Sequence, residues 1–127
     1  MNDNYTQTNI EVFITGLDRE RSVHFMTYTE CFSKLVFDLS TKPAKEWIDV
    51  YLNDAKKYFN KAVSHKFSFE GTQLTISDTD VNISDLQDYI DDLKESINIA
   101  NEFIKGKIER EQQRINGFNS TLDNLSF

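Results

Sequence analysis

The fold is decided by residues 66–77, KFSFEGTQLTIS. Apolar and polar residues alternate on both sides of Gly71-Thr72, as they do in two antiparallel strands that each bury one face. A two-residue turn with glycine first pairs Glu70 with Gln73. That register places four apolar side chains on one face of the pair, namely Phe67, Phe69, Leu74 and Ile76. The sequence therefore predicts a β-hairpin here.

Three further strands are predicted before the hairpin. Residues 10–15 alternate, with Ile10, Val12 and Ile14 on one face, and residues 23–28 alternate again. Residues 35–39 form the third segment, with Leu35, Phe37 and Leu39 pointing inward. The connections between these segments are short, which predicts an antiparallel meander.

Two helical patterns complete the chain. Apolar residues recur at helical spacing from Trp47 to Val63, after a Ser40-Thr41-Lys42-Pro43 start that offers a capping hydroxyl and a proline for the first turn. The second pattern begins with Ser84 and Gln87, the spacing of a capping box. It predicts a helix over residues 84–116, where Asn116-Gly117 is typical of a stop. An apolar tail, residues 118–127, follows.

This order, βββ-α-ββ-α, predicts the α+β class. We expect an antiparallel sheet with two long amphipathic helices packed on one of its faces, because that arrangement buries both apolar stripes. The 127 residues fit a single domain spanning 1–127, and four glycines with one proline give no sign of a linker.

Composition narrows the function classes. One cysteine, Cys31, excludes an internal disulfide and a multi-cysteine zinc site. The N-terminus has no signal-peptide pattern and no segment is apolar enough to cross a membrane, so we expect a cytoplasmic protein. The net charge of −7 opposes binding to nucleic acid or to an anionic membrane. The run of lysines from Lys56 to Lys66 does not change the expectation that the protein avoids nucleic acid, because carboxylates lie on the same predicted helix.

Catalytic and metal sites have little support in the sequence. Cys31 and His24 form a conceivable nucleophile–base pair, but no third partner is recognisable and no phosphate-binding loop or zinc spacing is present. Alternating oxygen-bearing residues in 78–82 suggest calcium. An EF-hand would require glycine at Ile83 and glutamate at Tyr89, and a helix rather than a strand before the loop. We therefore expect no catalytic residues, no metal and no cofactor.

The most distinctive predicted surface is the outer face of the second helix. Its acidic residues point away from the apolar stripe: Asp85, Asp88, Asp91, Asp92 and Glu95. The segment 83–104 carries a charge of −5, and Lys94 is its only internal counter-charge. One interpretation is a solvated face whose first carboxylates favour the helix dipole. The functional interpretation is an electrostatic surface for a protein partner with a basic surface.

A second candidate surface is the distal half of the same helix. It mixes both charge signs, yet it retains apolar residues that a second subunit could cover: Ile104, Ile108, Ile115 and Phe118. The alternative is a solvated segment.

Three function classes stay open. We favour a small acidic, non-catalytic protein-binding module, of the inhibitor, immunity or antitoxin kind, that acts through the acidic helix face. The first alternative is a homodimeric structural or assembly protein that uses the distal helix and the tail. The second is an enzyme or a calcium-binding protein that uses Cys31 or residues 78–82.

Overall fold

The predicted hairpin is present with the predicted register. A computed structural model describes residues 11–25 and 31–125 of the chain. Strands β4 (Lys66–Glu70) and β5 (Gln73–Asn82) pair Glu70 with Gln73 and continue to Lys66 opposite Ser77. Gly71 opens the turn with a φ of 58°, a conformation that costs glycine little because it has no Cβ. Alternation and turn chemistry together left one register that puts all four apolar residues on the core side, where Leu74 and Ile76 are buried and Phe67 and Phe69 are half-buried.

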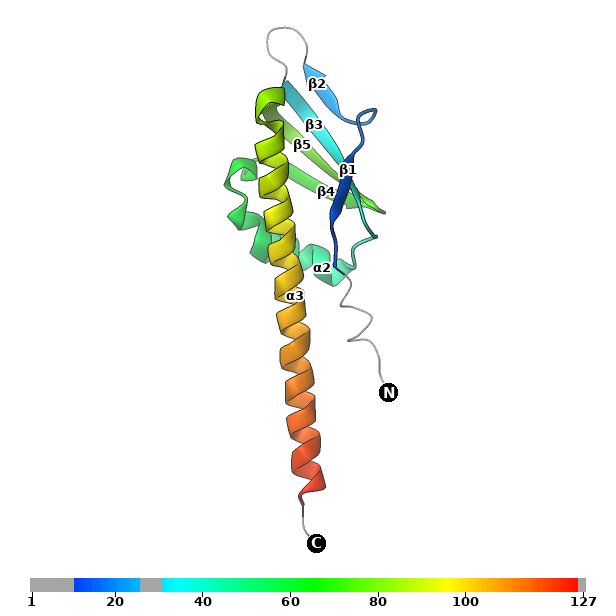
Figure 1. Cartoon of the computed structure of the whole chain (residues 1–127), viewed down its shortest axis with the longest axis vertical. Coiled ribbons are helices and arrows are strands. Elements are labelled where there is room, and N and C mark those ends of the chain that lie inside the picture. Colours follow the sequence, from blue (N-terminus) through cyan, green and yellow to red (C-terminus); the bar gives the residue numbers. More distant parts are fainter. Residues whose placement is uncertain (1–10, 26–30, 126–127) are drawn as a thin grey trace.

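The meander predicted at the start of the chain is not formed. β1 (Ile14–Leu17) and β2 (Val23–Phe25) both pair antiparallel with β3 (Cys31–Leu39), and β5 pairs with the other side of β3. β1 and β2 therefore run in the same direction and form one interrupted edge strand. The sheet order is β1-β3-β5-β4, with β2 beside β3 (Figure 1).

A short loop closes the gap in this edge strand. The Asp18 N–H donates to Val36 O at 2.8 Å, and the Val36 N–H donates to Ser22 Oγ at 3.0 Å. The Ser22 hydroxyl in turn donates to Asp18 O at 2.8 Å. Loop groups thus satisfy the backbone of Val36 where neither β1 nor β2 faces it, so the break leaves no unpaired backbone group there.

The first helical segment is neither long nor regular, contrary to the prediction. It consists of α2 (Lys45–Val50), a π turn η1 (Tyr51–Ala55) and two 3₁₀ turns, η2 (Lys56–Tyr58) and η3 (Asn60–Ala62). The buried residues Trp47, Tyr51, Ala55 and Phe59 are each four apart. In a regular helix of about 100° per residue, side chains four apart would rotate around the helix axis by about 120° between Trp47 and Phe59. The irregular turns keep all four residues in the core.

The predicted cap of this segment is also absent. α2 begins after Ala44 without a side-chain cap, and Ser40 Oγ instead accepts a hydrogen bond from the Phe13 N–H at 2.9 Å. The hydroxyl therefore ties the start of β1 to the end of β3.

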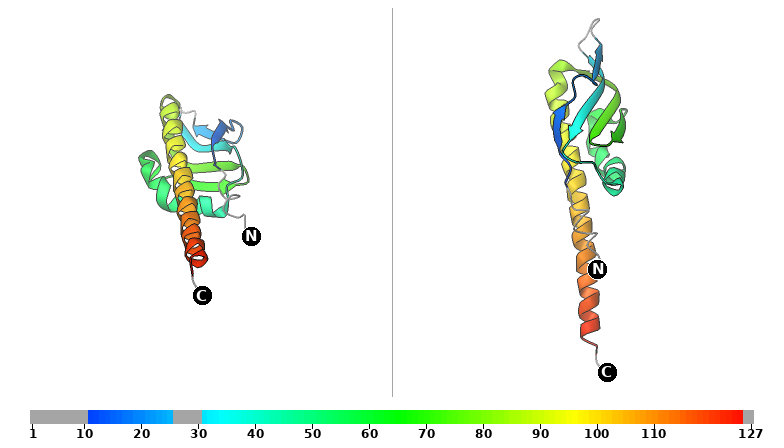
Figure 2. Two further views of the ribbon diagram at one scale, coloured as in Figure 1. Left: turned by 60° about the horizontal axis from the view of Figure 1, so that its bottom comes forward. Right: turned by 90° about the vertical axis from the view of Figure 1, so that its right-hand side faces the viewer.

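The second helix is longer than predicted. A 3₁₀ turn, η4 (Ile83–Asp85), leads into α3 (Leu86–Asp123), which passes Asn116-Gly117 without ending. No side chain caps its start, and Gln87 donates to Asp91 Oδ1 at 3.0 Å instead of forming the predicted capping box. Figure 1 shows α3 crossing the sheet and extending far beyond it, and both views of Figure 2 show the same projection. Residues 118–123 thus belong to the helix rather than to a separate tail.

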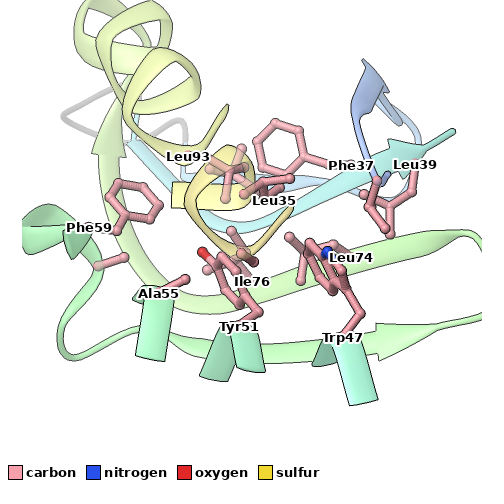
Figure 3. Packing of buried hydrophobic residues seen from close by; sticks show 14 of the residues in the cluster. Leu35, Phe37, Leu39, Trp47, Tyr51, Ala55, Phe59, Leu74, Ile76 and Leu93 are labelled. Atoms are coloured by element: carbon pink, nitrogen blue, oxygen red, sulfur yellow. The ribbon is translucent and has the colours of Figure 1, made fainter. Parts of the chain in front are cut away.

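One apolar cluster joins the sheet to both helical segments (Figure 3). Leu35, Phe37, Leu74 and Ile76 come from the sheet, and the ring of Tyr51 lies 5.7 Å from that of Phe67. The remaining buried members of the cluster include Trp47, Ala55, Phe59, Leu93, Ile97, Ala100, Ile104 and Ile108.

A buried asparagine fastens this cluster at one end of the sheet. Asn101 of α3 accepts hydrogen bonds through Oδ1 from the Val12 N–H at 3.0 Å and from Trp47 Nε1 at 2.8 Å. Its Nδ2 donates to Val12 O at 2.9 Å. The residue stands in the apolar stripe of α3, and its amide connects that helix to α2 and to the segment before β1.

Candidate functional site at the start of helix α3

An open pocket of about 440 Å³ lies where β5 passes into α3. Its polar side chains come from three separate segments: Lys61, His65, Asp80, Asn82, Asp85, Asp88 and Tyr89. Three are carboxylates, and they stand near the amino end of α3. The pocket thus combines the first part of the predicted acidic face with residues that the sequence did not connect to it.

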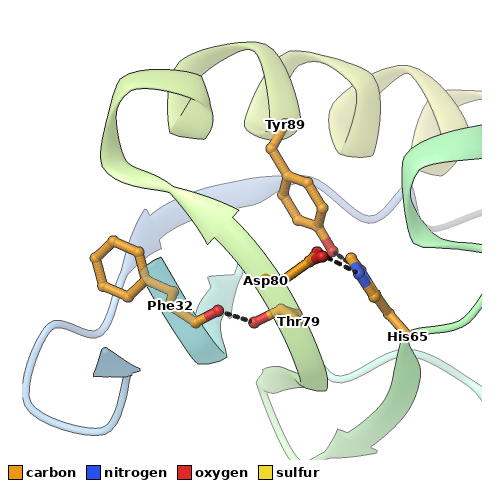
Figure 4. Close-up of polar contacts among 5 residues, drawn as sticks. All are labelled: Phe32, His65, Thr79, Asp80 and Tyr89. Atoms are coloured by element: carbon orange, nitrogen blue, oxygen red, sulfur yellow. Dashed lines mark hydrogen bonds and ion pairs between the residues drawn. The ribbon is translucent and has the colours of Figure 1, made fainter. Parts of the chain in front are cut away.

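His65 forms one wall of the pocket from the end of the first helical segment. Its ring is buried, its Nδ1 lies 2.9 Å from Tyr89 Oη, and its Nε2 lies 3.6 Å from Asp80 Oδ1 (Figure 4). Asp80 itself is exposed. The imidazole therefore connects a buried phenol to a carboxylate at the pocket surface.

Tyr89 is held in place by aromatic packing. Its ring lies 4.8 Å from that of Phe59 and 5.7 Å from that of His65. Burial raises the pKa of the Tyr89 phenol above its ordinary value, and the negative charge of Asp80 acts in the same direction. Tyr89 therefore keeps its proton at neutral pH and can serve the pocket as a hydrogen-bonding hydroxyl.

An irregularity in β5 turns Asp80 toward His65. The pairing advances from Lys34–Ser77 to Phe32–Val81, so four steps along β5 match two along β3. Asp78 takes a φ of 57°, which is uncommon for a residue other than glycine, and Thr79 donates to Phe32 O at 2.5 Å. Asp78 pairs with Lys66 at 3.2 Å. The segment that suggested calcium binding is therefore a bulge whose two carboxylates contact different side chains, Lys66 and His65.

The structure divides the predicted acidic face into three parts. Asp85 and Asp88 line the pocket. Asp92 is half-buried and pairs with Lys61 at 2.9 Å. Asp91 and Glu95 are exposed on the same helix outside the pocket. Lys94 is the only cation within residues 83–104, whereas Lys61 approaches from the preceding helical segment.

Lys61 is the cation of this region. Its hydrogen bond to Asp92 raises the pKa of the ammonium group, and the charges of Asp92, Asp88 and Asp85 contribute further. Lys61 also pairs directly with Asp92, and the three carboxylates that line the pocket, Asp80, Asp85 and Asp88, outnumber the one lysine among the lining residues. The electrostatics of the pocket favour a positively charged group.

The other lysines of the predicted basic run also have local partners. Lys56 donates to His65 O at 3.2 Å and lies 4.7 Å from the centre of the Phe67 ring. Lys66 pairs with Asp78, as described above. These contacts draw the lysines toward the domain's own carboxylates, carbonyls and rings.

Cys31 and His24 lie at the β2–β3 pairing. The register aligns Phe25 with Cys31 and His24 with Phe32, and the Cys31 thiol donates to Asn82 Oδ1 at 3.0 Å. The His24 side chain lies outside what the structure describes. In residues 11–25 and 31–125, no three His, Cys, Asp or Glu side chains converge as a metal site.

Comparison with known proteins gives no match, whether with family models, with curated proteins or with solved structures. Within the described part of the chain, no helix has both the length and the apolar character needed to cross a bilayer.

The predicted subunit-contact residues fall into two groups. Ile104 and Ile108 belong to the domain's own buried cluster, so the chain itself already covers them. Ile115 is half-buried and Phe118 is exposed, on the part of α3 that projects from the domain. The sequence pattern did not separate these groups because both continue one apolar stripe.

Proposed function

We propose that the protein is a small acidic, non-catalytic binding module that receives a basic group of a protein partner in the pocket at the start of α3. The observation that carries the proposal is that Asp80, Asp85 and Asp88 line one open pocket whose lining lysine, Lys61, is paired with Asp92. Inhibitor, immunity and antitoxin proteins are functional classes in which such a surface would act.

The lining of the pocket suits an arginine or lysine side chain in particular. Val81 and the Tyr89 ring offer apolar contact to the methylene stem, while the carboxylates stand where the charged head would lie. Arginine has the additional ability to bind a carboxylate through two parallel hydrogen bonds. Charges at the rim, including Asp91 and Glu95, would mainly speed the encounter with a basic surface.

The proposal can be tested with a hexa-arginine peptide as a defined probe at low ionic strength. We expect saturable binding that perturbs the NMR signals of Tyr89 and His65. The double variant Asp85→Asn/Asp88→Asn should lose about tenfold in affinity, because each 1.4 kcal/mol of lost interaction is tenfold in affinity. Added salt should weaken binding to the unmodified protein.

The matched control is Glu109→Gln/Asp123→Asn, which removes the same net charge from exposed positions farther along α3. If the two double variants bind the peptide equally, the pocket is not the site and only bulk charge matters. Capture of partners from native cell extract at low and high salt, with each double variant beside the unmodified protein, then identifies proteins that depend on the pocket.

A further inference from the structure

The apolar stripe of α3 follows a seven-residue repeat over most of the helix, with Asn101 and Glu111 as its two polar positions. From Ile97 onward the spacing alternates between four and three residues: Ile97, Asn101, Ile104, Ile108, Glu111, Ile115, Phe118, Leu122 and Leu125. Such a repeat keeps one seam of a helix facing a partner along its length. Leu125 follows the helix in a tight last turn, where its N–H donates to Leu122 O at 3.2 Å.

The partner of this seam changes along the helix. The first four positions are buried in the domain's own cluster or hydrogen-bonded to Val12 and Trp47. Ile108 is the last buried position of this seam, and the distal part of α3 projects beyond the sheet (Figure 1). There Phe118, Leu122 and Leu125 are 63%, 49% and 53% exposed. The seam thus continues as an apolar stripe that the described chain does not cover.

We infer that a second copy of this chain covers the stripe, in an antiparallel two-helix coiled coil centred on Ser120. Ile115, Phe118, Leu122 and Leu125 are separated by three, four and three residues, a pattern that is the same in both directions. An inverted copy therefore sets Ile115 beside the partner's Leu125 and Phe118 beside the partner's Leu122, and each apolar side chain meets another.

The antiparallel direction follows from two observations on the same seam. A parallel pair would place Glu111 beside its own copy, so that two carboxylates meet at a core position. It would also carry the partner helix back along Ile108 and Ile104, where α2 and the sheet already lie. In the antiparallel register Leu125 of the partner is level with Ile115, which leaves about 10 Å of helix before Ile108.

The flanks of the seam are compatible with self-pairing. Asn119 and Thr121 stand next to the seam on either side of the centre, and both are uncharged. Arg114, the nearest cation, forms an ion pair with Glu111 on its own helix. The pairing therefore brings no like charges together near its centre. It is independent of the pocket at the other end of α3.

The oligomeric state tests the inference directly. Sedimentation of the full chain from ten to several hundred micromolar should show a reversible monomer–dimer equilibrium. Phe118→Asp and, separately, Leu122→Asp should shift it to monomer over that range. Phe103→Asp is the matched control, because Phe103 is a 43% exposed aromatic on α3 outside the seam. Far-ultraviolet circular dichroism should show that all three variants stay folded, since none of these side chains is buried in the monomer.

A spin label fixes the direction of the pair. With Cys31→Ser removing the native thiol, a label at Glu109→Cys should lie about 33 Å along the axis from its copy in the antiparallel register. In a parallel pair the two labels would be level with each other. A monomer at several hundred micromolar, a Phe103→Asp variant as monomeric as Phe118→Asp, or level labels would each overturn the inference.

Discussion

At the scale of single residues, Asn101 shows how a polar side chain can organise an apolar core. Its amide satisfies both backbone groups of Val12 and the indole N–H of Trp47. A buried polar group stabilises a structure only when its partners are in place, and here both the oxygen and the nitrogen of the amide have theirs. The residue therefore specifies where the start of the described chain and α2 sit on α3.

We expect Asn101→Ala to lower the free energy of unfolding by about 2–5 kcal/mol, because it leaves two donors and one acceptor without partners. Chemical denaturation followed by Trp47 fluorescence measures this change. Asn98→Ala is the control, since Asn98 is exposed on the same helix and its replacement should alter stability by no more than about 0.5 kcal/mol. Equal stability of Asn101→Ala and the unmodified protein would show that the amide does not hold the core.

Asp78 gives a second prediction at this scale. Because its φ is 57°, a residue with a Cβ is strained there, whereas glycine is not. Asp78→Gly and Asp78→Ala both remove the ion pair with Lys66. The difference between their stabilities therefore reports the effect of the backbone conformation at this position. Thermal denaturation should find the glycine variant more stable by about 1 kcal/mol. The opposite order would mean that this bulge relaxes when the carboxylate is lost.

At the scale of elements, glycine has opposite effects in the hairpin and in the long helix. Gly71 has a φ of 58° and open space where a Cβ would stand, so Gly71→Ala should destabilise by about 1 kcal/mol through the backbone alone. Gly117 also has free space around it but sits inside α3. Gly117→Ala should stabilise the helix by about 1 kcal/mol. Thermal unfolding of both variants measures the two stability changes, which should have opposite signs. Changes of the same sign would contradict either the positive φ at Gly71 or the helical conformation at Gly117.

The elements also show how far the sequence determined the fold. Alternation about Gly71-Thr72 predicted the hairpin register, because a one-residue slip would turn Phe67 and Phe69 away from the core. Periodicity predicted both helical segments but not the π turn, since residues four apart satisfy the same pattern in either geometry. The direction of β1 relative to β2 was not predictable. Alternation describes one strand at a time and does not say which strand it pairs with.

At the scale of the whole molecule, stability should depend on pH through two buried phenols. Burial raises the pKa of Tyr51 and of Tyr89 above the ordinary value of a tyrosine. The unfolded chain therefore releases protons at a lower pH than the folded chain. The contribution of these two phenols to the free energy of unfolding is therefore fully present below about pH 10 and is lost as the pH rises beyond that value.

Urea denaturation between pH 8 and pH 11 measures this dependence. Tyr51→Phe should make the decline above pH 10 shallower, although it also removes the 2.8 Å hydrogen bond to Ser96 and so lowers stability at pH 8. Tyr58→Phe is the control, because Tyr58 is exposed. An unchanged slope for Tyr51→Phe would assign the alkaline loss to other groups.

The candidate site depends on the whole molecule more than on any segment. The sequence identified the carboxylates of α3, since helical spacing places them on one face. It did not connect them to His65 or Asp80, because the first helical segment and the β5 bulge reach the same pocket only through the topology of the sheet. Nor did it identify Lys61 as the partner of Asp92, which lies 31 positions later in the chain.

The interrupted strand beside β3 has a consequence for aggregation. A long, straight outer strand offers a ladder of unpaired amides and carbonyls on which another chain can polymerise. Here one border of the sheet is split into β1 and β2, of four and three residues. The other border is β4, five residues long, with charged Lys66 and Glu70 at its two ends. One border is interrupted and the other is short and ends in charged residues, so neither offers the long, uninterrupted ladder on which shared β-structure between molecules could grow.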